Sequence, residues 1–288
     1  MQAHLHVPVF TRGNELSIET DDEALREQFR FIIDRISDEL SEGGEGGEDM
    51  VASILNTGLS STFDAEGCSI SVPGALRKIY PKTRGQAQLV KALRAYDLVF
   101  APGPAGSGKT FLAVAEALRL VLSHKVNGIV LTRPVVEAGE SLGFLPGALE
   151  DKLNPYLRPL YDAMNLILPR ETVHKLTENG IIEIAPLAYM RGRTLGNVAV
   201  ILDEAQNTTR EQMKMFLTRM GEGCKMFVTG DLSQVDLPRR SPSGLIHVLS
   251  LLKRIPEIGM IELTGADVVR SALVRKIVQA CEDEQIDE

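Results

Sequence analysis

The amino-acid sequence predicts an α/β fold in which a mostly parallel sheet is covered by helices on both faces, with a small α/β unit in front of it. From about residue 76 onward, short apolar runs rich in β-branched residues alternate with helical segments, which is typical of strands buried on both faces. Four of the five runs end in a polar or glycine-rich turn, as ligand-binding strands do at their carboxyl ends. The expected strands span residues 97–101, 128–132, 198–203, 225–230 and 259–263.

The small N-terminal α/β unit is expected over residues 1–40. Alternating apolar residues in HLHVPVF and NELSIET predict a β-hairpin, and a helix follows it. We expect Thr20 to be the N-cap of that helix, with Glu23 three residues further on, and its apolar residues to share one face.

A connector is expected between this unit and the main domain, over residues 41–75. It begins with SEGGEGGED, which is too rich in glycine and acid to form a core and is typical of a flexible linker. An acidic interaction loop is the alternative. The main domain is expected over residues 76–280, with an acidic tail over residues 281–288.

The formal charge of −8 is distributed unevenly along the chain. Residues 1–75 contain 15 acidic and 4 basic side chains, whereas residues 76–280 contain 19 acidic and 27 basic ones. The main domain therefore carries a charge of +8. The acidic total does not exclude a nucleic-acid partner for this domain.

The composition argues against a membrane protein, a secreted protein and a protein built around disulfides or zinc. No apolar run approaches the roughly 20 residues of a membrane helix, and the N-terminus lacks the basic-then-apolar order of a secretory signal. We therefore expect a cytoplasmic protein that does not enter a membrane. The 3 cysteines and 5 histidines are scattered without paired spacing, so neither a disulfide framework nor a zinc site is expected.

The stretch GPAGSGKT, between an expected buried strand and an expected helix, fits the pattern G-x-x-x-x-G-K-[ST] without a mismatch. In such a loop the glycines let backbone N–H groups surround the phosphates, the lysine reaches the β and γ oxygens, and the threonine offers its hydroxyl to Mg²⁺. The sequence therefore predicts a P-loop NTPase. The nucleotide-binding residues are Gly103, Pro104, Ala105, Gly106, Ser107, Gly108, Lys109 and Thr110.

Two carboxylates follow a later strand, in VAVILDEAQNTT. Four apolar residues bring Asp203 to the end of that strand, where it can hold Mg²⁺ through water, as Thr110 does through its hydroxyl. Glu204 lies one residue further toward the γ-phosphate and suits a general base for an attacking water. This pattern favours hydrolysis over phosphoryl transfer to a metabolite.

A third strand is followed by polar residues, in KMFVTGDLSQVDLP. In nucleotide-driven motors such a strand lies between the phosphate-loop strand and the acidic strand, and a polar group at its end senses the γ-phosphate. Thr229, Asp231 and Gln234 are the polar residues here, and Gln234 is our candidate for a catalytic sensor. An ordinary turn is the alternative.

The chain resembles the PhoH-like proteins, ATPases related to superfamily 1 RNA and DNA helicases. The resemblance covers about residues 76–280, through PKTRGQ, GPAGSGKT, LTRPVVEAGESLGFLPG, NPYLRPLYDA, MRGRTLGN, VILDEAQN, TGDLSQVDLP and DVVR. It implies ATP as the nucleotide and places Gln86 to read the adenine edge. It also implies a role linked to RNA and, in bacterial relatives, a functional link to an rRNA-processing endoribonuclease.

The sequence departs from the family pattern at several points. Ser107 stands where many relatives have threonine, which leaves phosphate binding by the backbone intact, and Ser271 follows DVVR where histidine is usual. Some relatives carry an N-terminal nuclease domain, but the first 75 residues here are too short and lack a carboxylate cluster, so we expect no nuclease activity. This unit is similar to a KH-like RNA-binding fold, although it has no GXXG loop.

Arginines of the basic domain are candidates for contacts with single-stranded RNA. Arg133 follows a strand end in LTRP, and Arg191 and Arg193 flank Gly192 in MRGRT. Guanidinium groups bind nucleic-acid backbones or the carboxylates of a protein partner. Ordinary surface charge is the alternative.

Together these patterns predict Mg²⁺-dependent ATP hydrolysis coupled to RNA remodelling or translocation. An ATP-dependent switch or scaffold that delivers an endoribonuclease to rRNA without unwinding is the alternative that the sequence does not separate from it. A small-molecule kinase is disfavoured because Glu204 follows Asp203 and no arginine-rich lid is evident.

A homo-oligomeric ring is also expected. The γ-phosphate needs a cation beyond Lys109, and relatives place the DVVR segment, which contains Arg270, close to a nucleotide site. A chain with a single helicase-like lobe has no second lobe to bring such an arginine in, so a neighbouring subunit would supply it. This predicts a closed ring, with a hexamer favoured. For Arg270, a charge on a helix surface is the alternative.

Overall fold

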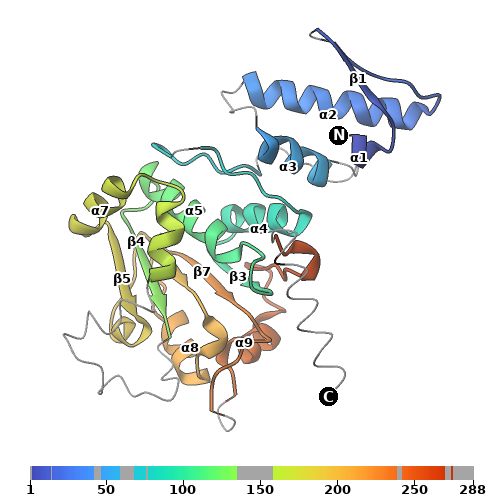
Figure 1. Ribbon diagram of the computed structural model, residues 1–288. Helices are drawn as coiled ribbons and strands as arrows, with labels where there is room; N and C mark the ends of the chain where they lie inside the picture. Colours follow the sequence, from blue (N-terminus) through green and yellow to red (C-terminus); the bar gives the residue numbers. More distant parts are fainter. Residues whose placement is uncertain are drawn as a thin grey trace.

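A six-stranded sheet forms the centre of the larger domain, and a separate two-stranded sheet belongs to the N-terminal unit (Figure 1). The structure is a computed structural model. It describes residues 2–13, 15–41, 47–58, 68–75, 77–134, 158–238, 242–269 and 274. Within these residues, no helix is both long enough and apolar enough to cross a membrane.

The larger domain alternates strands and helices. It contains α4 (Arg84–Ala95), β3 (Leu98–Pro102), α5 (Lys109–Leu122), β4 (Gly128–Arg133), α7 (Arg170–Glu178), β5 (Ile182–Pro186), β6 (Val198–Leu202), α8 (Arg210–Leu217), β7 (Lys225–Gly230), α9 (Gly244–Leu252) and β8 (Ile258–Met260). Three short 3-10 turns follow strands: η2 (Leu187–Met190), η3 (Ala205–Asn207) and η4 (Gly265–Asp267). Residues 158–165 are also helical.

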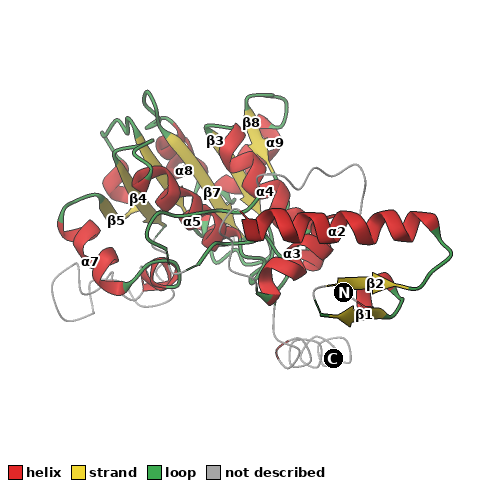
Figure 2. Ribbon diagram, turned by 90° about the horizontal axis from the view of Figure 1, so that it is seen from above, coloured by secondary structure: helices red, strands yellow, loops and turns green. Residues whose placement is uncertain are grey.

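The strands lie side by side in the order β5-β4-β6-β7-β3-β8, and every neighbouring pair is parallel (Figure 2). This confirms the predicted parallel sheet and its five expected strands, although β8 ends at Met260 rather than at residue 263. Strand β7 lies between β3 and β6, as predicted for the sensor strand. The sequence analysis missed β5, an edge strand whose alternation is broken by the partly exposed Glu183.

Helices cover both faces of the sheet because successive strand residues point to opposite sides. Ile201 and Phe227 pack on the face covered by α4, α5 and α7. Val200 and Val228, one residue away from these along their strands, pack on the face covered by α8 and α9. The two faces thus have separate cores, and the predicted α/β arrangement, consistent with a P-loop NTPase, is confirmed.

The N-terminal unit consists of α1 (Gln2–Leu5), β1 (Val9–Arg12), β2 (Glu15–Ile18), α2 (Glu23–Ser41) and α3 (Glu48–Gly58). Strands β1 and β2 pair antiparallel, which confirms the predicted hairpin. The first expected strand is shorter than predicted, because the chain enters it from the helical turn α1. The likeness to a KH fold stays a prediction.

Helix α2 is capped by Asp22 and not by Thr20, so the predicted N-cap is wrong. Oδ1 of Asp22 accepts hydrogen bonds from the backbone N–H groups of Ala24, at 3.0 Å, and Leu25, at 3.3 Å. The Thr20 hydroxyl instead accepts from the backbone N–H of Asp22, at 3.2 Å. Asp22 prevails because it directly precedes the first helical residue, where its charge also suits the positive end of the helix.

Helix α3 lies within the range expected to be a linker and was not predicted. Its Met50 and Leu55 are buried against Ile32 of α2. The short helix therefore completes the small core of the N-terminal unit. Parts of the expected linker, residues 42–46 and 59–67, lie outside the described residues, and the domain boundaries stay predictions.

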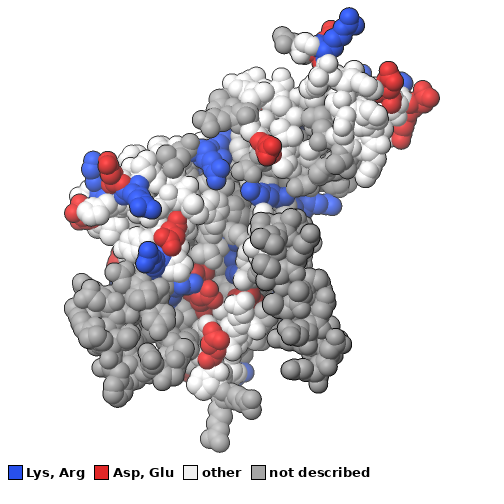
Figure 3. All heavy atoms as spheres, viewed as in Figure 1, with Lys and Arg blue, Asp and Glu red and all other residues white. Residues whose placement is uncertain are grey.

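A charged contact joins the N-terminal unit to the larger domain. Glu39, near the end of α2, accepts hydrogen bonds from Nζ of Lys78, at 2.5 Å, and from the hydroxyl of Tyr80, at 3.3 Å. Figure 3 shows Lys and Arg side chains gathered where the two parts adjoin. The acidic unit thus meets basic residues at the start of the main domain.

The cap of α2 can be tested by mutation. We expect Asp22→Ala to destabilise the first turn of α2 by about 1 kcal/mol, because it leaves two helical N–H groups without a capping oxygen. Thr20→Ala should cost less, since it removes only a contact to the cap residue. Hydrogen exchange of the Ala24 and Leu25 amides measures the effect. Equal protection loss in the two variants would assign the cap to both residues.

Candidate functional site

The phosphate loop joins β3 to α5 at the carboxyl edge of the sheet. Gly106 and Gly108 have positive φ angles of 81° and 80°, which glycine adopts without strain. A Cβ atom on Gly103 would lie 2.7 Å from Cβ of Leu263, so packing also requires a glycine there. The loop therefore has the tightly turned backbone, followed by a helix N-terminus, that cradles phosphate groups.

Lys109 is the first residue of α5 and is buried. Its Nζ donates a hydrogen bond to the backbone oxygen of Pro104, at 3.1 Å. Burial lowers the pKa of Lys109, and the nearby carboxylates of Asp231, Asp203 and Glu204 oppose this shift only in part. A buried ammonium group among anionic partners is well placed to bind phosphate oxygens.

Asp203 lies buried directly after β6, and its Oδ1 is shared by two hydroxyl groups. Thr110 Oγ1 and Thr229 Oγ1 each donate to it at 2.7 Å. Hydroxyl and carboxylate oxygens are the ligands that Mg²⁺ prefers. The structure thus brings together Thr110 and Asp203, as expected for residues that would hold the metal with its bound waters, and their oxygen atoms fit such a site.

Glu204 is more accessible than its neighbour, with 41% of its side chain exposed compared with 4% for Asp203. Its φ angle of 53° is uncommon for a residue other than glycine and turns it away from the strand direction. Water can therefore reach the carboxylate of Glu204 beside the phosphate loop. This exposure suits the predicted general base.

Arg133 lies inside this site and not on an open surface, which differs from the predicted RNA contact. Its Nε and Nη2 both lie 3.0 Å from Oδ2 of Asp203, and Nη2 lies 2.9 Å from Oε1 of Glu204. Only 14% of the side chain is exposed. The sequence shows a cation at a strand end, but its partners follow from the strand order, which places β4 beside β6.

The end of β7 holds the phosphate loop through Asp231. Its Oδ2 accepts a hydrogen bond from the backbone N–H of Ala105, at 2.9 Å. Burial alone would raise the pKa of Asp231, but hydrogen bonds from Ser233 and Ala105, together with the charge of Lys109, bring it below its usual value. Gln234 is exposed and follows Asp231 in the same turn, so its role as sensor stays a prediction.

Gln206 is a site residue that the sequence analysis did not identify. Its Nε2 donates to Oε2 of Glu204, at 2.6 Å, and to the backbone oxygen of Gln234, at 3.1 Å. Its Oε1 accepts from the backbone N–H of Asp231, at 2.9 Å. Gln206 therefore links the ends of β6 and β7. The signal available in the sequence was its place directly after the two acids in DEAQN.

Gln86 lies on α4 beneath the loop and is buried. Its Nε2 donates to the backbone oxygen of Ser107, at 2.9 Å, and its Oε1 accepts from the backbone N–H of Lys82, at 2.7 Å. A pocket of about 380 Å³ lies beside it, lined by apolar side chains such as Phe111, by loop glycines and by the cationic residues Arg77, Lys78 and Lys82. Both ends of the Gln86 amide are thus bound by backbone atoms, and adenine reading by Gln86 stays a prediction.

The segment that precedes Arg270 lies against the phosphate loop. The backbone N–H of Val269 donates to the oxygen of Gly106, at 3.0 Å. Asp267 accepts hydrogen bonds from the Thr83 hydroxyl, at 2.5 Å, and from the Gly85 N–H, at 3.2 Å, at the start of α4. Arg270 itself lies outside the described residues.

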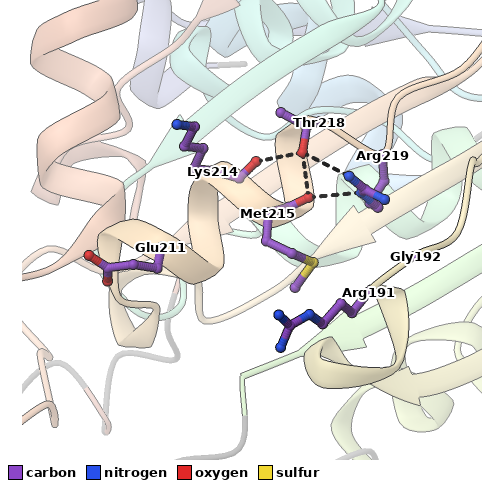
Figure 4. A pocket seen from close by; sticks show the side chains of 7 residues that line it. All are labelled: Arg191, Gly192, Glu211, Lys214, Met215, Thr218 and Arg219. Carbon is purple, nitrogen blue, oxygen red and sulfur yellow. Dashed lines mark hydrogen bonds between the residues drawn. The ribbon is translucent and has the colours of Figure 1, made fainter.

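The two predicted RNA-contact arginines of MRGRT differ in their surroundings. Arg193 forms a bidentate ion pair with Glu183, at 2.5 and 2.7 Å, which raises the pKa of Arg193. Arg191 is exposed and makes no side-chain hydrogen bond within the described part of the chain. Arg191 lines a groove of about 500 Å³ together with Met215 of α8 and Arg219 of the following turn, and Figure 4 shows these side chains.

The loop, the buried Lys109 and the Thr110–Asp203 pair at the edge of a parallel sheet define a P-loop ATPase. The family model for PhoH-like protein matches residues 78–282, and the chain belongs to this family. Membership of this family implies ATP as the nucleotide and Mg²⁺ as its metal ion.

The similarity to individual relatives extends beyond this domain. The chain is 47% identical over 291 residues to a PhoH-like protein of Bacillus subtilis (strain 168), covering 97% of this chain and 89% of the relative. It is 48% identical over 284 residues to a PhoH-like protein of Mycobacterium tuberculosis (strain ATCC 25618 / H37Rv), covering 97% and 79%. The large terminase of a thermophilic bacteriophage is similar in structure, with a TM-score of 0.41 and 12% identity over 67% of this chain and 49% of the terminase.

Two substitutions should separate nucleotide binding from turnover. Lys109→Ala should abolish ATP binding, because it removes the buried cation beside the loop. Glu204→Gln should preserve binding and lower the turnover rate by about 10²- to 10⁴-fold, because it removes only the base. Titration with a fluorescent ATP analogue and phosphate release measure the two effects. Wild-type turnover in Glu204→Gln would show that another group activates the water.

Proposed function

We propose that this protein couples Mg²⁺-dependent ATP hydrolysis to the remodelling of, or movement along, single-stranded RNA. The observation that supports RNA most directly is the pair of exposed side chains on the turn after β5, Tyr189 and Arg191. Tyr189 is 52% exposed and lies two residues before Arg191. Both belong to the domain that carries a charge of +8.

An exposed aromatic ring next to an arginine suits single-stranded nucleic acid. Unpaired bases stack on tyrosine rings, while guanidinium groups bind the phosphate backbone. Arg193 fits this role less well than the sequence implied, because Glu183 already neutralises its charge. The proposed contact therefore rests on Arg191 and Tyr189.

Hydrolysis is favoured over phosphoryl transfer by the position of Glu204. The exposed Glu204 carboxylate lies directly after the buried Asp203, so water can reach it and lose a proton to it. A small-molecule kinase is the less supported alternative.

An ATP-dependent switch that delivers an endoribonuclease to rRNA is the second candidate function. It is favoured by the contacts that tie segments outside the central sheet to the nucleotide site, namely Val269 to Gly106 and Glu39 to Tyr80. Such contacts suit a protein in which the bound nucleotide changes the conformation of segments that a partner binds. ATP hydrolysis measured with and without single-stranded RNA, followed by strand separation on a tailed duplex, tests both. Stimulation with no separation favours the switch.

RNA binding should depend on Arg191 and Tyr189. We expect Arg191→Ala to weaken the affinity and to reduce the salt dependence of binding by about one unit of slope, because one phosphate contact is lost. Tyr189→Ala should weaken binding by about 1–3 kcal/mol through lost stacking. Fluorescence anisotropy with a labelled oligonucleotide at several salt concentrations measures both. Arg193→Ala is the matched control, and an unchanged affinity in all three variants would remove RNA from this surface.

The proposed ring places Arg270 of one subunit at the phosphate site of its neighbour. Arg270→Ala should then lower turnover by about 10³- to 10⁵-fold while ATP binding persists. Mixing Arg270→Ala subunits with Glu204→Gln subunits should restore activity, because one subunit supplies the base and the other the arginine. Phosphate release from mixtures whose mixed assembly is verified by mass spectrometry measures this. Silent mixed assemblies would mean that Arg270 does not act between subunits.

A further inference from the structure

We propose that Arg133 is a positioning residue for ATP hydrolysis. Its guanidinium group holds Asp203 and Glu204 in a fixed relative arrangement, with the first carboxylate turned toward the phosphate loop and the second toward solvent. This inference rests on the ATPase activity of the site and is independent of the proposed RNA role.

The need for such a residue follows from the charges at the end of β6. Asp203 and Glu204 are consecutive carboxylates, and Asp231 lies close enough to affect the same lysine. Like charges in a partly buried site repel one another unless cations separate them. Lys109 lies on the loop side of this group, and Arg133 approaches from β4, the neighbouring strand.

Arg133 contacts the two carboxylates at the same time. Nε and Nη2 converge on Oδ2 of Asp203, each at 3.0 Å, and Nη2 also lies 2.9 Å from Oε1 of Glu204. A planar guanidinium presents several N–H groups in a fixed fork, whereas a lysine presents one ammonium on a flexible stem. The guanidinium therefore fixes the orientation of the two carboxylates relative to each other and also compensates their negative charge.

The contacts to Arg133 leave the functional sides of both acids available. On Asp203 they occupy Oδ2, while Oδ1 faces the Thr110 hydroxyl that would help to hold Mg²⁺. On Glu204, Arg133 takes Oε1 and Gln206 takes Oε2, at 2.6 Å. Each carboxylate oxygen of Glu204 has a second lone pair. The base is therefore fixed from β4 and from β7, through Gln206, and can still accept a proton from water.

The backbone of Glu204 gives an independent reason for external support. Its φ angle of 53° lies in the left-handed region, which disfavours side chains other than those of glycine, asparagine and aspartate. Such a conformation persists where surrounding contacts hold it. Arg133 and Gln206 supply contacts of this kind on the side chain.

Turnover and nucleotide affinity, measured without RNA, separate positioning from a general structural role. Arg133→Gln should lower kcat by about 10²-fold, because a base displaced by about 1 Å loses its alignment with water. The affinity for a fluorescent ATP analogue, measured without Mg²⁺, should stay near wild type, since the loop and Lys109 are untouched. Arg133→Lys should recover part of the loss by restoring the charge without the fork. Arg193→Gln removes a more exposed arginine–carboxylate ion pair, with Glu183, and should leave kcat unchanged.

A second measurement needs no turnover. Urea unfolding of the nucleotide-free Arg133→Gln, Glu204→Gln and double variants forms a cycle, and residues in contact give non-additive effects. We expect the midpoint shifts not to add. Additive shifts, or wild-type kcat in Arg133→Gln, would overturn the proposal. The proposal would also be overturned if Arg133→Gln lost affinity for RNA while its turnover without RNA stayed unchanged, because Arg133 would then be an RNA-binding residue. Absence of RNA stimulation in the wild type would count against the proposed function alone.

Discussion

The site depends on a single buried carboxylate, that of Asp203, which connects three strands and the phosphate loop. Thr110 from the loop and Thr229 from β7 donate to one of its oxygens, and Arg133 from β4 binds the other. A buried carboxylate without partners is strongly unfavourable, so these groups must be in place together. The strand order β4-β6-β7-β3 is what brings all of them within hydrogen-bond distance.

The parts of the site that form within one short stretch of chain could be predicted from the sequence. Thr110 and Lys109 follow from a loop whose glycines, lysine and threonine have fixed spacing, and Asp203 follows from an apolar run that must end at the sheet edge. The parallel sheet could be predicted because buried strands have a strong apolar signature. The place of β7 in it was predicted from the strand order of nucleotide-driven motors. The parts that were missed have weaker or less local signals.

The role of Arg133 depends on which strand lies beside β4, a tertiary fact that LTRP does not encode. Gln206 acts through an amide that binds three groups from two strand ends, and its residue type gives no sign of this. Strand β5 lies at an edge, where one side is not paired and polar residues are tolerated. Helix α3 directly follows a glycine-rich acidic run whose composition is typical of a linker, and this hides the apolar face of the short helix.

The contact between Glu39 and Tyr80 connects the N-terminal unit to a residue that lines the pocket beside the phosphate loop. A ligand in this pocket would therefore contact a residue that α2 also holds. If a ligand in the pocket shifts Tyr80, it changes the free energy of the Glu39 contact, and thermodynamic linkage requires the reverse effect to be equal in size. A macromolecule that binds the N-terminal hairpin and displaces α2 would then alter the affinity for nucleotide without approaching the phosphates. In turn, nucleotide exchange would alter the affinity for that macromolecule by the same factor.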